Sequence, residues 1–274
     1  EQCVYQVGGI EVAATPARWE ELKRKQGVAM SYGLEGRLLT PQEVKQHIPI
    51  LDARVILGGY YVPTDADVRG WHCAAALAQM AMNAGAEFVG DVEVLDIPVR
   101  NGRARAVVTN QGTVECEFVL LCTNVWASVL ADKVGLRFPL LGVEHQLVYT
   151  EPLPELAADR ERFVTHPILR HQDYSLYYRQ WYDGYAIGNY RHESLLLDGD
   201  QVGARAERAF TPEHFTVAQA ATDELLPSLR GKRFVRAFNG YMAFSNDLYP
   251  IVGQTRIRGL WAALGVWVTH SGGV

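Results

Sequence analysis

The chain has 274 residues, with 26 Lys and Arg against 31 Asp and Glu, so its formal net charge is -5. This acidic balance disfavours a nucleic-acid partner, which would require a basic face. With 48% hydrophobic residues the chain can form one large domain or two smaller ones, and its longest apolar runs, such as 118–122, are the length of strands rather than of membrane spans.

Three Thr-Pro pairs mark helix starts, because threonine is a good N-cap and proline suits the first helical position. They are Thr15-Pro16, Thr40-Pro41 and Thr211-Pro212, and Thr40 with Glu43 also forms a capping-box pattern. Helices are therefore predicted to begin near residues 16, 41 and 212. The third would end at Pro227 and bury one face, made of Phe215, Ala218, Ala221 and Leu225.

A fourth helix is predicted over residues 67–83, with Gly85 as its C-terminal cap. Helical spacing places five apolar residues on one stripe: Val68, Trp71, Ala75, Ala78 and Met82. His72 lies one residue off that stripe, which favours a surface or packing role.

The periodicity then changes to that of strands. A strand is predicted over 91–99 and a hairpin over 103–122 that turns at 110–112, and the apolar end of the hairpin predicts a buried central strand leading into a strand-to-helix turn at 123–135. Alternating segments follow at 143–152, 174–181 and 185–191. Two short extended pieces flank Asn246-Asp247 within 234–253. This order predicts a mixed α/β fold with two interleaved layers.

The four cysteines, at positions 3, 73, 116 and 122, have neither metal-binding nor redox-motif spacing. Reduced thiols in a cytosol-like compartment are therefore expected. The first residue is Glu1 rather than Met, which suggests a fragment cut at both ends. We expect a cytoplasmic location, or the mitochondrial matrix in a eukaryote.

Several separated stretches carry a family resemblance: GTVECEFVLLCTNVWAS (112–128), GVEHQLVYTEP (142–152), PILRHQDYSLYYRQWYDGYAIGNY (167–190), FNGYMAFSNDLYPIVGQT (238–255) and GLWAALGVWVTHSGGV (259–274). In order and spacing the chain resembles the flavin-dependent amine oxidoreductases of the D-amino-acid-oxidase superfamily. Within it, the chain is most similar to the dimethylglycine oxidase and dimethylglycine dehydrogenase family, with sarcosine dehydrogenase close behind.

The resemblance implies a substrate domain with an antiparallel sheet and helices, interleaved with the later strands of a Rossmann-like FAD-binding domain. Residues 1–85 would begin the substrate domain, 86–140 would supply FAD-domain strands, 141–250 would form the substrate-binding sheet, and 251–274 would return to the FAD domain. The Gly-x-Gly-x-x-Gly turn of the family is not found in this sequence. Flanking segments or a partner subunit would then complete the flavin site, and tetrahydrofolate would bind only through a module that this chain lacks.

By resemblance, the backbone of Val94 would meet the adenine of FAD, and Trp126 would pack near the cofactor. The flavin ring itself would contact Val266, Trp267, Val268 and Thr269, because glycines near them allow close approach. An ordinary core strand followed by a loop is the alternative. Asn124 stands where the family has a small glycine, which argues against close cofactor approach at that turn.

Oxidation of an amine N-methyl group by hydride transfer needs the amine lone pair free, and a histidine is a suitable base near neutral pH. From the residue alone, His145 reads as a satisfied core histidine, whereas the resemblance places it facing the substrate. Tyr177 shares a strand face with Ser175 and Arg179 and is the implied pocket residue. Packing of the strand on a helix is the alternative, and it suits Tyr178 better.

Arg170, Arg179 and Arg191 are candidates to bind a substrate carboxylate, but a surface or sheet-edge role is favoured for each of them. No metal site is predicted, because the His-Glu pair at 192–193 lacks a second histidine at helical spacing. Ser271 lacks the nucleophile-elbow pattern of serine hydrolases. The expected function is FAD-dependent oxidative demethylation of N-methylated glycine derivatives such as N,N-dimethylglycine. The alternatives are a sarcosine or 4-methylaminobutanoate oxidoreductase, and a flavin-free ligand-binding fragment.

Overall fold

The structure is a computed structural model, and it describes residues 2–190, 193–197, 202–203 and 205–266. The chain divides into two compact units. Unit 1 comprises Glu1–Ala86, Gln146–Glu193 and Ala209–Asn239, and unit 2 comprises Glu87–His145, Ser194–Arg208 and Gly240–Val274. Two long strands, β12 (Leu140–Thr150) and β18 (Phe234–Ser245), contain the boundaries between them. The chain thus alternates between the units, as interleaving requires.

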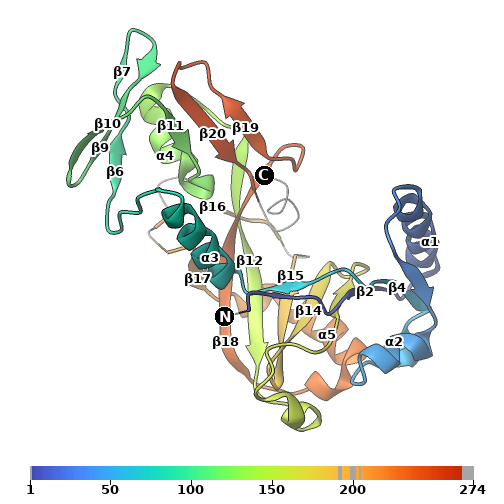
Figure 1. The fold of residues 1–274 in the computed structure, drawn as a ribbon. Helices are drawn as coiled ribbons and strands as arrows, with labels where there is room; N and C mark the ends of the chain where they lie inside the picture. Colours follow the sequence, from blue (N-terminus) through green and yellow to red (C-terminus); the bar gives the residue numbers. More distant parts are fainter. Residues whose placement is uncertain (1, 191–192, 198–201, 204, 267–274) are drawn as a thin grey trace. The chain divides into compact units, whose positions relative to one another are not determined.

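The largest sheet has the strand order β17-β18-β12-β15-β14-β13-β2-β4-β3, and β16 also pairs with β12 (Figure 1). Its unit 1 strands, besides parts of β12 and β18, are β2 (Gly9–Ala13), β3 (Arg37–Leu39), β4 (Gly58–Val62), β13 (Ile168–His171), β14 (Leu176–Trp181) and β15 (Gly184–Asn189). The β14–β15 hairpin turns at Tyr182-Asp183, as its sequence predicts. Most neighbours are antiparallel, whereas β2 and β13 run parallel.

Two of the Thr-Pro predictions are confirmed. Helix α1 (Pro16–Ser31) has Thr15 as its N-cap, and α2 (Pro41–His47) begins with the complete capping box of Thr40 and Glu43. These features depend only on residues within one turn of the helix start, which is why local sequence was sufficient to find them.

The third Thr-Pro prediction is wrong in its details. Pro212–His214 forms a 3-10 turn, and helix α5 (Thr216–Leu225) begins only after it. Thr211 makes no cap, because its hydroxyl accepts hydrogen bonds from Gln146 Nε2 at 2.8 Å and Asn239 Nδ2 at 3.1 Å. The predicted buried face of α5 is nevertheless correct.

The core of unit 1 lies between one face of the large sheet and helices α2 and α5. Sheet residues such as Leu169, Tyr178 and Ile187 are buried there with Val44 of α2 and Leu225 of α5. The Tyr178 hydroxyl lies 3.2 Å from that of Thr222, which anchors α5 to β14. Tyr178 is therefore a core residue, as the sequence favoured.

Helix α3 (Gly70–Asn83) begins three residues later than predicted, since Asp67–Val68 is strand β5 and pairs with β1 (Val4–Tyr5). The apolar stripe of this helix is not its buried side. Trp71 is 70% exposed, and His72 is the buried residue of the helix. Periodicity identifies residues that share a face, but not which face meets a core. The predicted cap is confirmed at Gly85, which has a φ of +97° and donates its amide to Met82.

Unit 2 contains two small three-stranded sheets and a short strand pair. One sheet has the order β10-β9-β6, with β6 (Val94–Asp96), β9 (Ala106–Thr109) and β10 (Gly112–Glu115). The other has the order β11-β20-β19, with β11 (Val119–Leu121), β20 (Leu260–Leu264) and β19 (Ile251–Gln254). The pair is β7 (Val99–Arg100) and β8 (Arg103–Ala104), and β16 (Leu195–Leu197) and β17 (Glu207–Ala209) join the large sheet.

Two strand predictions in unit 2 need correction. The segment 91–99 is split between β6 and β7, and the second hairpin strand is split into an exposed β10 and a separate β11. The break occurs because the chain changes partners: Cys116 donates its amide to Arg105, whereas Val119 donates to Gly259. The predicted buried strand is thus only Val119–Leu121, which pairs in parallel with β20.

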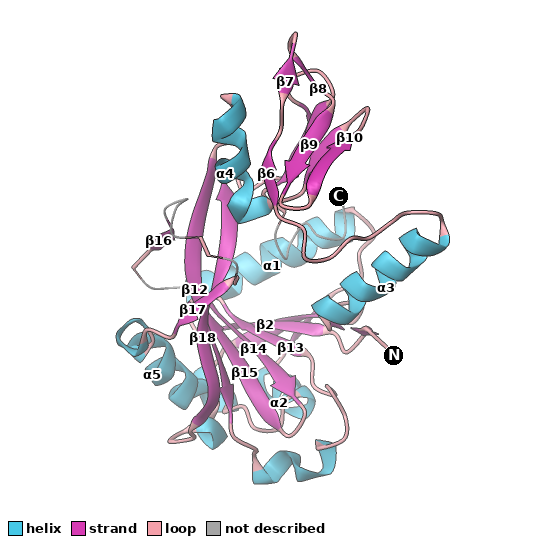
Figure 2. Cartoon of the chain, turned by 90° about the vertical axis from the view of Figure 1, so that its left-hand side faces the viewer, coloured by secondary structure: helices cyan, strands magenta, loops and turns pink. Residues whose placement is uncertain are grey.

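After β11 the chain turns through η2 (Asn124–Trp126) into helix α4 (Ala127–Ala131) and η3 (Asp132–Val134), which confirms the predicted strand-to-helix turn. Helix α4, labelled in Figure 2, buries Leu130 and Ala131 in one hydrophobic cluster with Leu121 of β11 and Leu260 of β20. Further short turns in the described part of the chain are η1 (Ala53–Val55), η4 (Pro154–Asp159) and η7 (Pro227–Leu229). Among the described residues, no helix is both long and apolar enough to span a bilayer.

Candidate functional site

Strand β14 presents a half-buried face opposite the core of unit 1. Alternate residues of a strand point to opposite sides, and the two sides of β14 differ in burial. The buried residues are Leu176, Tyr178 and Gln180, and the half-buried residues are Tyr177, Arg179 and Trp181. This face therefore carries two aromatic side chains and one guanidinium.

Tyr177 lies against Gly188 of the neighbouring strand, its partner in the strand register. A Cβ atom at Gly188 would fall only 1.9 Å from Cε1 of Tyr177, so only glycine allows the ring to lie there. The Tyr190 ring centroid is 5.4 Å away. Burial, with the nearby Tyr190 phenol, raises the pKa of Tyr177. Its hydroxyl therefore stays protonated, and able to donate, well beyond neutral pH.

Arg179 pairs with a buried carboxylate. Its Nη1 lies 2.9 Å from Oδ1 of Asp67, which is 2% exposed, and its guanidinium lies 5.0 Å from the centroid of the Trp181 ring. Burial raises the pKa of Asp67, and the guanidinium opposes that shift. The charge of Arg179 is thus already matched within unit 1. Arg170 is exposed on β13, and Arg191 lies outside the described residues.

His145 lies on the part of β12 that belongs to unit 2. It is half-buried, whereas its neighbours Glu144 and Gln146 are buried on the other side of the strand. The imidazole meets Phe244 edge to face, with ring centroids 5.7 Å apart. Glu144 pairs with Arg208 at 3.3 Å. The strand therefore separates a structural ion pair on one side from the histidine on the other.

The turn after β11 brings two predicted cofactor residues into one region of unit 2. Trp126 donates its indole N–H to the Gly203 carbonyl at 2.9 Å. Val266, just after β20, has its carbonyl 3.0 Å from Nδ2 of Asn124, two residues before Trp126. The other predicted contact residues, Trp267, Val268 and Thr269, lie outside the described residues.

Val94 lies on β6, an edge strand of its sheet. It is opposite Thr109 of β9, with an irregularity before Asp96, and its side chain packs on the core of unit 2. Within the described part of the chain, β6 has β9 as its ladder partner on one side. Val94 therefore lies at an edge of this sheet, and its contact with the adenine stays a prediction.

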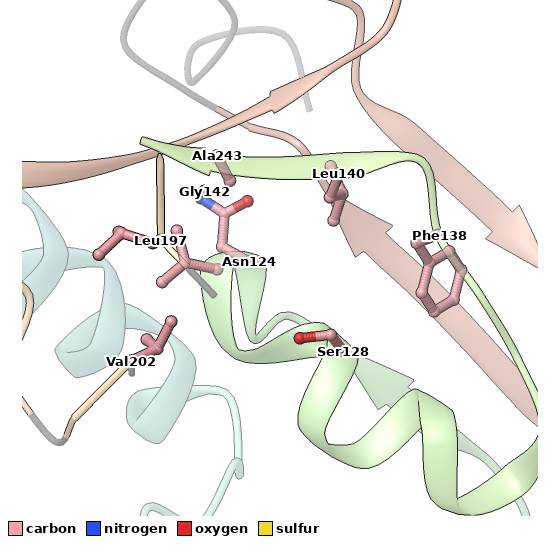
Figure 3. Close-up of a pocket in the computed structure, with 9 residues that line it drawn as sticks. Asn124, Ser128, Phe138, Leu140, Gly142, Leu197, Val202 and Ala243 are labelled. Atoms are coloured by element: carbon pink, nitrogen blue, oxygen red, sulfur yellow. The ribbon is translucent and has the colours of Figure 1, made fainter. Parts of the chain in front are cut away.

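A pocket of about 180 Å³ opens beside Asn124, entirely within unit 2. Figure 3 shows Asn124 and Ser128 projecting from the turn and helix α4, with Leu197 and Val202 to one side and Phe138 and Leu140 to the other. The surface that lines it is more polar than apolar, and the lining residues include Asn124 and Ser128. The pocket is smaller than the roughly 300–1,000 Å³ usual for a whole small ligand, so it fits only part of one.

Across the described residues, no cluster of three or more His, Cys, Asp or Glu side chains is arranged to hold a metal ion. The four cysteines are free thiols in the structure.

Comparison with known proteins is consistent with this arrangement. Residues 1–274 match the DAO family, described as FAD dependent oxidoreductase. The chain belongs to this family. Its sequence resemblance to flavin-dependent oxidoreductases is thereby confirmed, and so is the mixed α/β fold.

Among curated relatives, the chain is 29% identical to the mitochondrial dimethylglycine dehydrogenase of Rattus norvegicus over 281 residues, which cover 98% of this chain and 32% of that protein. It is 27% identical to the formaldehyde-forming 4-methylaminobutanoate oxidase of Paenarthrobacter nicotinovorans over 265 residues, covering 94% and 31%. The chain therefore spans about a third of the length of these relatives.

Among solved structures, L-proline dehydrogenase from P. horikoshii superposes with a TM-score of 0.81 at 22% identity, over 96% of this chain and 67% of that one. At this identity the likeness establishes the fold. The shared fold extends over nearly the whole length of this chain.

Sequence reasoning missed the roles of two residues, Gly188 on β15 and Asn124 in the turn after β11. Gly188 was one of several glycines in alternating strands, and its role appears only once the strand register places it under Tyr177. Asn124 was read as an obstacle to a cofactor. Asparagine adopts a positive φ more readily than most residues, so the residue type itself was the available signal. In the structure the φ of Asn124 is +45°.

Proposed function

We propose that the full-length protein is an FAD-dependent oxidoreductase that demethylates N-methylated glycine derivatives, with N,N-dimethylglycine as the model substrate. The family match over residues 1–274 carries the proposal. The similarity to a dimethylglycine dehydrogenase and to a 4-methylaminobutanoate oxidase supports N-methylated amines as the substrate class.

The proposed substrate-facing residues are His145 on β12 and Tyr177 on β14. The imidazole would hold the amine proton, because only an unprotonated amine has the lone pair that expels a hydride from its N-methyl group. Tyr177, whose raised pKa keeps its hydroxyl protonated, would donate a hydrogen bond and form a wall of the pocket. Each side chain is half-buried on a regular strand, which limits its motion.

FAD, when bound, supplies the hydride acceptor for this reaction. The chain's own candidates to hold it are the backbone of Val94, the indole of Trp126, and the segment formed by Val266, Trp267, Val268 and Thr269. The pocket beside Asn124 fits part of such a cofactor, and segments outside this chain or a partner subunit would hold the rest. Tetrahydrofolate would need a further module.

Sarcosine and 4-methylaminobutanoate are the alternative substrates, and they differ from dimethylglycine mainly in the length of pocket they need. A flavin-free ligand-binding protein is the alternative of another class, motivated by the Gly-x-Gly-x-x-Gly turn not found in this sequence. A cytoplasmic location, or the mitochondrial matrix in a eukaryote, completes the proposal.

The test is anaerobic mixing of the purified full-length protein with each of the three amines, following bleaching of the flavin absorbance. His145→Ala and Tyr177→Phe should each slow bleaching by dimethylglycine at least about 100-fold and about 10-fold respectively, with the flavin still bound. Unchanged rates in both variants would remove these two assignments. A colourless protein that binds the amines would instead support the ligand-binding alternative.

A further inference from the structure

Strands β11 and β20 run parallel and end at the same edge of their sheet. Val119, Leu120 and Leu121 are opposite Leu260, Trp261 and Ala262, and backbone pairing stops soon after. In open α/β sheets, ligands bind beyond the carboxyl ends of parallel strands. The chain that leaves β20 at this edge is the segment proposed above to meet the flavin.

The side chain of Asn124 bonds to the backbone of Gly265 and Val266, the two residues that follow β20. Its Oδ1 accepts a hydrogen bond from the Gly265 amide at 2.9 Å, and its Nδ2 donates to the Val266 carbonyl at 3.0 Å. A carboxamide carries an acceptor and two donors, so it can bond to a backbone N–H and a backbone C=O at the same time. Here it links the turn after β11 to the chain that leaves β20.

The backbone at both partners is adapted to this contact. Asn124 has a φ of +45° and Gly265 a φ of +68°, both in the left-handed region. Glycine and asparagine are among the residues that adopt that region most readily. The positive φ redirects the chain after β11, and the amide of Asn124 contacts the other strand rather than solvent.

We propose that Asn124 is a positioning residue, whose amide fixes the direction in which Gly265 and Val266 leave β20. It thereby sets the position of Val266, the first of the residues proposed above to meet the flavin. This second step rests on the proposed function, because the flavin contact of those residues is itself a proposal. The asparagine thus has a use at a position where the family resemblance led us to expect a small glycine.

Three variants of the full-length protein test the inference. Asn124→Gly suits the positive φ and removes both hydrogen bonds. Asn124→Asp keeps the shape, but its carboxylate cannot donate to the Val266 carbonyl until it is protonated. Asn101→Gly is the matched control, because Asn101 has a φ of +52° in the same unit and only its backbone carbonyl has a hydrogen bond there, from Arg258 at 2.9 Å.

The first readout is hydrogen exchange at the Gly265 amide in flavin-free protein. Exchange should be at least about 10-fold faster in Asn124→Gly than in the wild type, and unchanged in Asn101→Gly. The carboxyl of Asn124→Asp faces a carbonyl, so its pKa should lie above the usual value. Lowering the pH toward 5 should therefore restore protection relative to Asn124→Gly measured at the same pH.

The second readout is the flavin itself. Asn124→Gly should weaken FAD binding about 10-fold and change the visible absorbance of the bound flavin, and Asn124→Asp should recover both as the pH falls. If the Gly265 amide of Asn124→Gly exchanges at the wild-type rate, the proposal that the Asn124 amide holds Gly265 and Val266 in place is overturned. Lost protection with unaltered flavin binding and absorbance would overturn the orienting role.

These outcomes separate the inference from the proposed function. A wild-type protein that binds no FAD would overturn the proposed function and the orienting role of Asn124. Hydrogen exchange in the flavin-free protein would still decide whether the Asn124 amide holds Gly265 and Val266 in place. A protein that binds FAD and reduces it with amines, yet shows no effect of Asn124→Gly, would overturn the inference alone.

Discussion

Asp67 illustrates at the scale of one residue how the half-buried face of β14 is held. The carboxylate is 2% exposed, and its ion pair with Arg179 compensates part of the cost of burying its charge. Removing one partner of a buried pair leaves an uncompensated charge, which typically costs more than the pair itself contributes. Arg179 is therefore better understood as a support of this face than as a free cation for a ligand.

Arg179→Met should destabilise the protein in a pH-dependent way. Burial already raises the pKa of Asp67, and loss of the guanidinium would raise it further. The folded variant then holds this proton more tightly than the unfolded chain, so its stability falls as the pH rises above the unfolded value near 4. Urea unfolding should show a loss of about 3 kcal/mol at pH 8 and a smaller loss at pH 5.

The exposed Arg170 on the adjacent strand provides the control. Arg170→Met should change the unfolding free energy by less than about 0.5 kcal/mol at either pH. Adding Asp67→Asn to Arg179→Met should remove the pH dependence. An equal loss at pH 5 and pH 8 in the single variant would mean that the charge of Asp67 is not the cause.

Among single residues, sequence could suggest roles but not contacts. His145 and Tyr177 were singled out because polar or aromatic residues in mid-strand need a reason, and the family resemblance supplied one. Asn124 was considered only for its side-chain size, and its backbone contacts could not be predicted. Its two hydrogen bonds join residues 141 and 142 positions apart, and no local pattern records such a contact.

At the scale of elements, the β14–β15 hairpin determines where the Tyr177 ring lies. Gly188 is opposite Tyr177, and the ring occupies the space that a Cβ at residue 188 would need. The position of the phenol is therefore a property of two strands together. A change on β15 should move it without altering the tyrosine.

Gly188→Ala should lower kcat/KM for the amine about 10-fold, because overpacking displaces the ring. In a Tyr177→Ala background the same substitution should have little effect, since the clash is gone, and a double-mutant cycle measures this difference. Gly184→Ala is the control on the same strand face: its added Cβ would lie 3.0 Å from the Thr150 carbonyl, away from Tyr177. Equal losses from Gly188→Ala in both backgrounds would contradict the proposed link.

Helix starts were predictable where the cap is satisfied locally, as at Thr15 and Thr40. Thr211 carries the same signature but fails as a cap, because Gln146 and Asn239 compete for its hydroxyl. The split of the predicted hairpin strand has a similar cause, since β11 pairs with β20, which follows it by more than a hundred residues. The local sequence pattern identified the helical and strand segments, whereas contacts with residues distant in the sequence determined where each element begins and ends.

At the scale of the whole molecule, the chain passes repeatedly between two units. Unit 1 carries the aromatic face of β14, and unit 2 carries the turn at Asn124 and the end of β20. Sequence anticipated interleaving from the order of helical and strand segments. The roles of the units in substrate and flavin binding came from the family resemblance, and they remain proposals.

The central claim is oxidative demethylation, and identifying which bond of the substrate is oxidised tests it most directly. Full-length protein should be incubated without oxygen with dimethylglycine, and the products compared with the amount of flavin reduced. Oxidation of an N-methyl group followed by hydrolysis yields sarcosine and formaldehyde, whereas oxidation of the methylene group yields dimethylamine and glyoxylate. We predict one sarcosine per reduced flavin. Formation of glyoxylate and dimethylamine, or flavin that stays oxidised, would contradict demethylation by this protein.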